Sequence, residues 1–303
     1  MKRMLILSPP EDRSGRALTL GAAIAERFGA DVDVLRVLEE DQNSAALEAK
    51  THAGATLRDV LLDAERESLE AVLQPLRATS RDVRVEVEWG VPWESVISRV
   101  EARGIDLVVK PAGGLSRSGN VFFGSTALHL FRRCPCPVWV VGESAQLPER
   151  ILAAVDPTNE PHRRRLAERV LHWADEIADW TCSSIDVASA WSTPDLARVE
   201  THLDETDRER LRTEALQATT ADVDEVLLAR REPIESSRLH VVEGRPTEVL
   251  PTIAEQSAAD LIVMGTLSRP DRAGDLLGAT AETIVRQVRC SVLTVPPTAT
   301  LEL

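Results

Sequence analysis

The feature that most constrains the fold of this chain is an internal repeat. Identical residues recur 154 positions apart, as Asp106 with Asp260, Gly124 with Gly278, Thr126 with Thr280 and Cys136 with Cys290. The match has no gaps over about fifty residues and also includes Gly90-Val91-Pro92 and Gly244-Arg245-Pro246. A chain of 303 residues is long enough for two domains. The repeat therefore predicts two copies of one domain, at residues 1–145 and 149–303.

Each half alternates short apolar runs with segments of helical spacing. Strands are expected at 3–8, 32–38, 83–87, 105–109 and 137–141, and again at 150–155, 182–190, 239–242, 261–264 and 292–295. Helices are expected at 16–28, 53–78, 121–133, 161–177 and 281–288, with a short helix starting at Pro92 and a mostly helical acidic region at 194–228. This order predicts an α/β fold in which each half is a five-stranded parallel sheet with helices on both faces.

Composition excludes several classes of function. The net charge is −14, with 18 basic and 21 acidic residues up to Leu147 (−3) and 17 basic and 28 acidic residues after it (−11). An acidic surface argues against binding of DNA or RNA, whose phosphates need neutralisation. No apolar run approaches the ~18 residues of a membrane span, and the N-terminal run is too short for a secretory signal. We therefore expect a cytoplasmic protein that binds neither nucleic acid nor a membrane.

The cysteines and histidines show no metal-binding or catalytic spacing. The four cysteines form no CxxC pair, so buried or inert thiols are expected in a reducing compartment. The segment Cys134-Pro135-Cys136-Pro137 is interpreted as a turn before a strand, with a redox pair as the less favoured alternative. We therefore predict no metal site and no catalytic residue.

The most informative stretch in each half is a strand followed by a glycine-bearing loop and a helix. It runs from Ile105 to Thr126 in the first half and from Leu261 to Thr280 in the second. This arrangement presents backbone N–H groups to a phosphate. Asp156 ends the first strand of the second half, at the sheet edge where ligands of parallel sheets bind. An equally simple role for Asp156 is to cap a helix.

Several motifs resemble the universal stress protein domain. They are AAVDPTNEPH, MGT…LGATAET and RCSVLTV in the second half, and FGST…RRCPCPVWVV in the first. The whole chain resembles the tandem, E-type members of that family. This resemblance implies two flavodoxin-like, Rossmann-like domains and a stress-response or regulatory role without enzyme activity.

The resemblance also implies a nucleotide site in the second half. Nucleotide-binding members of the family have an Asp at the end of the first strand and a G-x2-G-x9-G-[S/T] loop that cradles the phosphates of ATP. The second half keeps the Asp and two glycines, with Ser in place of the middle glycine and Ala in place of the Ser/Thr. The site implied for ATP, with Mg²⁺, comprises Asp156, Gly265, Thr266, Ser268, Gly278, Ala279 and Thr280. Arg269 and Arg272 could close over the phosphates.

The first half departs from the family pattern at other positions, whereas its Gly114, Gly124 and Ser125 match. Ser8 aligns with Asp156, so the carboxylate is missing, and Pro111 replaces the first glycine and has no N–H to donate. Lys110 could supply positive charge instead. A degenerate site is therefore expected at Ser8, Lys110, Gly114, Gly124, Ser125 and Thr126, and the second half is favoured for nucleotide binding.

Three classes of function remain open. The favoured one is a regulatory binding module that senses a nucleotide. An ATP-hydrolysing switch is the alternative, although the loop lacks the P-loop GK[ST] lysine and no base is evident. A carrier of an apolar ligand in a cleft between the domains is a further alternative.

The last strand of each half is expected to form an assembly contact. Single-domain members of the family pair through this strand, so a tandem chain can form an internal pseudo-dimer. The candidate contact residues are Val138, Val140, Val292 and Val295. A further homodimer can form, and the sequence identifies no protein partner.

Overall fold

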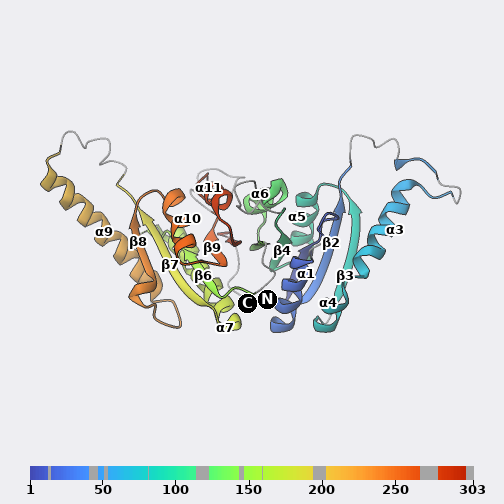
Figure 1. Ribbon diagram of the computed structural model, residues 1–303, viewed down its shortest axis with the longest axis horizontal. Helices are drawn as coiled ribbons and strands as arrows, with labels where there is room; N and C mark the ends of the chain where they lie inside the picture. The colour runs from blue at the N-terminus through green and yellow to red at the C-terminus, as the bar shows by residue number, and fades with distance from the viewer. Residues whose placement is uncertain are drawn as a thin grey trace. The chain divides into compact units, whose positions relative to one another are not determined.

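The computed structural model describes residues 1–12, 15–40, 47–50, 54–80, 82–113, 123–142, 147–158, 160–193, 203–266 and 279–297. These residues form two compact units, one up to Gly142 and the other from Leu147 onward. Figure 1 labels most of the helices and strands of each unit.

The first unit is a parallel sheet with helices on both faces. Its elements are β1 (Arg3–Leu7), α1 (Arg16–Phe28), β2 (Asp31–Leu38), α3 (Leu57–Glu70), α4 (Gln74–Thr79), β3 (Val83–Trp89), α5 (Pro92–Arg103), β4 (Leu107–Pro111), α6 (Gly124–Arg133) and β5 (Val138–Val141). The strand order is β3-β2-β1-β4-β5, and each neighbouring pair is parallel. Helix α1 packs against α4, and α5 packs against α6.

The second unit repeats this architecture. Its elements are β6 (Arg150–Ala154), α7 (Pro161–Thr181), β7 (Ser184–Trp191), α9 (Glu205–Leu227), the 3₁₀ turn η2 (Ser236–Arg238), β8 (Leu239–Glu243), α10 (Pro246–Gln256), β9 (Leu261–Gly265), α11 (Ala279–Gln287) and β10 (Ser291–Val295). The order β8-β7-β6-β9-β10 matches that of the first unit, and these pairs are also parallel. The predicted fold class is therefore confirmed.

The repeated aspartates fix the start of the first strand in each unit. The Asp106 carboxylate accepts a hydrogen bond from the backbone N–H of Arg3 at 3.0 Å, and Asp260 accepts one from Arg150 at 3.0 Å. Arg3 and Arg150 are therefore equivalent, although the later parts of the two halves are 154 residues apart. The separation of the two first strands is not 154 residues, because the two halves have different numbers of residues between the first strand and the repeated segment.

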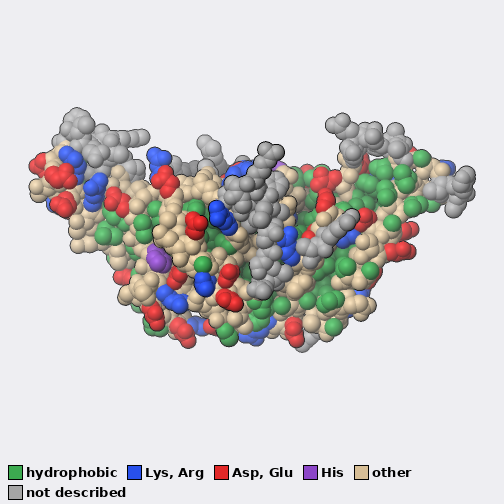
Figure 2. Space-filling model, viewed as in Figure 1, with side chains coloured by type: hydrophobic (Ala, Val, Ile, Leu, Met, Phe, Trp, Pro, Cys, Tyr) green, Lys and Arg blue, Asp and Glu red, His purple; other side chains and the backbone are tan. Residues whose placement is uncertain are grey.

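The helix predicted at 53–78 is two helices. α3 ends at Glu70, and α4 begins at Gln74 with Pro75 in its first turn, where the missing N–H of proline is tolerated. The predicted apolar stripe is only partly buried: Leu69, Leu73 and Leu76 are buried, whereas Leu57, Val60 and Val72 are more than one third exposed. Figure 2 shows hydrophobic side chains gathered on this side of the first unit.

Two other helices differ from the sequence expectation. α7 continues to Thr181, four residues beyond the expected end, and stops where Cys182 adopts a left-handed conformation with φ of 57°. α10 was not predicted, although Pro246 repeats Pro92 and both prolines begin helices. None of the described helices is both long enough and apolar enough to cross a membrane.

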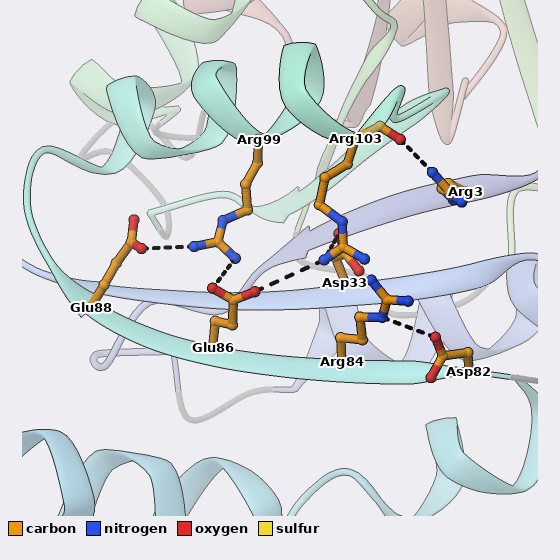
Figure 3. A network of polar contacts seen from close by, with 8 residues as sticks. All are labelled: Arg3, Asp33, Asp82, Arg84, Glu86, Glu88, Arg99 and Arg103. Carbon is orange, nitrogen blue, oxygen red and sulfur yellow. Dashed lines mark hydrogen bonds and ion pairs between the residues drawn. The ribbon is translucent and has the colours of Figure 1, made fainter.

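A network of ion pairs fixes α5 to the strands beneath it (Figure 3). Arg99 pairs with Glu86 and, at 2.7 Å, with Glu88, while Arg103 pairs with Asp33 at 2.8 Å. Burial raises the pKa of Asp33, and the nearby Arg103 opposes that shift. The network holds α5 against β2 and β3. The end of β3 and the start of α5 meet at the carboxyl edge of the sheet, because only Gly90 and Val91 lie between them.

Candidate functional site

A pocket of about 800 Å³ opens at the carboxyl edge of the first sheet. The ends of β1, β2, β3 and β4 contribute to its wall through Leu7, Leu38, Trp89 and Pro111. Strand order reverses between β1 and β4, and ligands of open parallel sheets bind at such a switch point. The volume falls within the ~300–1,000 Å³ that is typical of small-molecule sites.

The pocket combines apolar walls with charged groups. The apolar lining residues are Leu7, Val37, Leu38, Leu61, Trp89 and Phe123. The charged lining residues are Glu11, Asp12, Arg16, Glu39, Glu65 and Lys110. A ligand with both an apolar portion and a charged portion would match this lining.

Lys110 is the most unusual of these residues. It is the fourth residue of β4, its side chain is 4% exposed, and its ammonium group donates to the carbonyl oxygen of Pro111 at 2.5 Å. Burial lowers the pKa of Lys110 to about 8, and the negative charges of Asp12 and Glu11 oppose this shift. Among the described residues no carboxylate lies within ion-pair distance of the ammonium group.

The N-terminus of α6 lies in the same pocket. Gly124, Ser125 and Thr126 line it, and no side chain caps the helix. Gly124 has a φ of 74°, which favours glycine at this position. The N–H groups of a first helical turn have no partner within the helix and attract anions. The Lys110 ammonium group and the N-terminus of α6 therefore both attract an anion into this pocket.

Ser8 does not line this pocket, because it is tied to a buried arginine. Arg36 on β2 donates to the Ser8 carbonyl oxygen at 3.0 Å and to its hydroxyl oxygen at 3.2 Å, and pairs with Glu65 of α3 at 2.7 Å.

The predicted equivalence of Ser8 and Asp156 is wrong by one residue. Because Arg3 and Arg150 are equivalent, Ser8 is equivalent to Val155 and not to Asp156. The backbone N–H of Ser8 donates to the carbonyl oxygen of Leu35 on β2, and that of Val155 donates to Ala188 on β7 in the same way.

In the second unit, three of the predicted site residues meet at a smaller cavity. Asp156, Gly265 and Thr280 line a space of about 140 Å³ at the carboxyl ends of β6 and β9. This volume is well below that of typical small-molecule sites. Ala279 is the first residue of α11. Gly114, Ser268, Arg269, Arg272 and Gly278 lie outside the described residues.

Side chains of α7 occupy much of the space at the predicted second-unit site. A Cβ atom on Gly265 would lie 2.6 Å from Leu166 Cδ2, so the Leu166 side chain packs directly against the Gly265 backbone. Arg163 forms an ion pair with Asp156. The Thr266 N–H donates to the carbonyl oxygen of Val295 at 3.1 Å and is therefore used by the sheet, contrary to the phosphate-binding role predicted for it.

The cysteines and histidines assemble no metal centre in the part of the chain that the structure describes. The Cys134 and Cys136 thiols are buried with their sulfur atoms 3.6 Å apart. The hydrogen bond with the Cys134 thiol raises the pKa of Cys136, and burial raises it further.

Sequence reasoning missed Arg36, Trp89 and Phe123. Arg36 had a visible signal, because a charge interrupts the otherwise apolar strand of residues 34–38 and a buried charge needs a partner. The two aromatic residues gave no such signal, since scattered rings most often belong to a core.

Comparison with known proteins agrees with this architecture. The profile described as "Universal stress protein family" matches residues 1–142 and 148–296. Universal stress protein E of Escherichia coli K12 is 31% identical over 224 residues, which cover 71% of this chain and 68% of that protein. Universal stress protein E of Photorhabdus laumondii is 23% identical over 98% of this chain and 95% of its own length.

Solved structures show the same fold. A functionally unknown protein from Pseudomonas aeruginosa PAO1 has a TM-score of 0.73 at 22% identity, over 98% of this chain and 93% of that one. A universal stress protein from Archaeoglobus fulgidus has a TM-score of 0.65 at 19% identity, over 97% and 96%. With both halves matched by one family profile, the chain belongs to the universal stress protein family as a tandem member with two such domains.

Proposed function

We propose that this protein is a cytoplasmic, non-catalytic stress-response and regulatory module that binds a nucleotide such as ATP in the pocket of its first unit. The observation that carries the proposal is the buried ammonium group of Lys110 in a pocket of about 800 Å³. Buried charges are normally paired, because desolvation is costly. A buried cation in an open pocket, with no carboxylate partner among the described residues, supports a ligand of opposite charge.

The lining matches the two parts of a nucleotide. The apolar lining, which includes Trp89 and Phe123, suits a base, and Lys110 with the first N–H groups of α6 can bind phosphate. The carboxylates Glu11 and Asp12 would repel bare phosphates, so the Mg²⁺ complex of ATP should bind better than free ATP.

The second unit, which sequence reasoning favoured, supports nucleotide binding less well. A nucleotide there would have to displace Leu166 from Gly265 and separate Arg163 from Asp156. Its cavity of about 140 Å³ would also have to grow several-fold. These contacts favour the first unit as the ligand site.

Isothermal titration with ATP and Mg²⁺ tests the proposal. We expect the Lys110→Met variant to bind about tenfold more weakly than the wild type, or weaker still, because a hydrogen bond to a charged group contributes roughly 1.5–3 kcal/mol. The replacement has a precedent in the chain, since Met264 holds the equivalent position of β9. Asp156→Ala is the matched control in the second unit and should leave the affinity unchanged.

Two outcomes would contradict the proposal. Absence of heat at millimolar ATP would exclude a nucleotide role, and loss of binding in Asp156→Ala alone would place the site in the second unit.

Phosphate release measured in the same samples distinguishes binding from hydrolysis. Native mass spectrometry of the purified protein would reveal an apolar ligand, and light scattering would distinguish the predicted pseudo-dimer through Val138, Val140, Val292 and Val295 from a further homodimer.

A further inference from the structure

The Lys110 amine has surroundings that differ from those of an ordinary surface lysine. It stands on a buried strand, in register with Val140 of β5, and reaches the pocket from the end of β4. Its hydrogen-bond acceptor, the Pro111 carbonyl oxygen, is neutral. A neutral acceptor stabilises the ammonium form less than a carboxylate would.

Two of the other charged groups that line this pocket interact with other parts of the first unit. Glu65 is paired with Arg36, and Arg16 donates to the carbonyl oxygen of Gly142 at 2.9 Å. Glu39 lies on the rim at the end of β2, and Glu11 and Asp12 follow β1. Burial outweighs the combined effect of Asp12 and Glu11 on the Lys110 pKa, so the neutral amine is accessible near neutral pH.

We propose that Lys110 is a reactive amine that captures small aldehydes as an imine inside the first-unit pocket. A primary amine becomes a nucleophile toward carbonyl carbon when it is desolvated in an apolar site. An uncharged aldehyde with an aliphatic or aromatic tail would also suit the apolar wall and avoid the carboxylates of the rim. The inference rests on the same pocket as the proposed function, but it requires no nucleotide.

The reaction is balanced without any oxidant or reductant. The nitrogen lone pair of the neutral amine forms a bond to the carbonyl carbon, and the proton released from nitrogen passes to the carbonyl oxygen. The resulting carbinolamine loses water as the carbon–nitrogen double bond forms. Asp12 or Glu11, which line the pocket, can transfer the protons. Amine and aldehyde thus give imine and water, and hydrolysis reverses the step.

The chain is well suited to a direct test because its only lysines are Lys2, Lys50 and Lys110. Lys2 and Lys50 are exposed and serve as internal references. The full chain is treated with propanal and cyanoborohydride at pH 7 without nucleotide, and the propylated lysines are quantified by peptide mapping. An amine of pKa about 8 has a roughly 300-fold larger neutral fraction at pH 7 than one of pKa 10.5.

We expect Lys110 to be modified at least about tenfold faster than Lys50, because burial will offset part of its larger neutral fraction. The rate at Lys110 should rise through about pH 8 and that at Lys50 only toward pH 10. Unfolding in urea should make the three lysines react alike, and Lys110→Arg, which keeps the positive charge, should lose the adduct.

Slower modification of Lys110 than of Lys50 in the folded protein would overturn the inference. So would a Lys110 rate that rises only toward pH 10. Because the reaction is run without nucleotide, its outcome is independent of the titration with ATP. Binding of ATP without an adduct would leave the proposed function standing and overturn only the imine chemistry, and an adduct without ATP binding would do the reverse.

Discussion

Replacing Lys110 with methionine should raise the free energy of unfolding at pH 7 by roughly 2 kcal/mol, whereas most substitutions destabilise a protein. Burial lowers the pKa of Lys110 from 10.5 to about 8. Each pKa unit corresponds to about 1.4 kcal/mol, so the charged form costs the folded state roughly 3 kcal/mol. Loss of the hydrogen bond to Pro111 offsets about 1 kcal/mol of the gain.

The gain should depend on pH in a defined direction. Below about pH 8, Lys110 is protonated in both the folded and unfolded states, so the destabilisation is fully present. Between about pH 8 and 10.5 the folded protein has released the proton while the unfolded chain still holds it, and wild-type stability therefore rises. The stability difference between variant and wild type should fall by roughly 2 kcal/mol from pH 7 to pH 9.5, where it should be close to zero. Urea denaturation followed by tryptophan fluorescence at both pH values measures it.

Two variants control for effects unrelated to burial. Lys50→Met replaces an exposed lysine and should change stability by less than about 0.5 kcal/mol. Met264→Lys places an amine at the equivalent buried position and should destabilise the second unit. A Lys110→Met variant less stable than the wild type at pH 7, or a difference that does not change with pH, would contradict the account of Lys110.

The Arg230→Met substitution should lower the free energy of unfolding by about 3 kcal/mol. The Arg230 guanidinium, 6% exposed, donates to Asp175 of α7 through Nε at 3.0 Å and Nη2 at 2.6 Å. Methionine keeps an apolar stem in place but leaves the Asp175 carboxylate, which is 14% exposed, without its cation, and removing one partner is the costly way to break a largely buried pair. The pair joins the turn after α9 to α7, the helix that carries Arg163 and Leu166 into the second-unit cavity.

The adjacent Arg231 provides a matched control. It pairs with Glu176 and Asp179 of the same helix but is 64% exposed. Arg231→Met should cost only about 0–1 kcal/mol, and added salt should reduce that cost further. Urea denaturation of both variants at low and high salt measures the contrast. Equal losses for the two variants would show that burial does not set the strength of these pairs.

The strands could be predicted because parallel strands buried on both faces appear as continuous apolar runs. Leu261 to Met264 is such a run, and all four residues are buried. Helix ends were predictable where one residue decides them, as at Gly29, which ends α1 in a left-handed conformation with φ of 62°. The break between α3 and α4 was missed because the apolar spacing continues across it even though Pro75 begins a new helix.

The relative merit of the two sites could not be predicted from the motif residues. The second unit keeps the Asp and the first glycine of the family pattern, which the first unit lacks, and the sequence therefore favours it. The volume of a pocket depends instead on side chains from other elements, such as Leu166 of α7 on Gly265. In the first unit, the same motif positions border a larger space, and the residue that distinguishes it, Lys110, stands where the second unit has Met264.

Photo-crosslinking with an azido-purine analogue of ATP tests most directly the central claim that the ligand site is in the first unit. The analogue is irradiated with the full chain and Mg²⁺, and the modified peptide is mapped. We predict an adduct on the segments that line the first-unit pocket, 7–12, 89–92, 110–113 or 123–126, and its loss in the presence of excess ATP. An ATP-protected adduct confined to 154–170 or 280–284, which line the second-unit cavity, would contradict the claim.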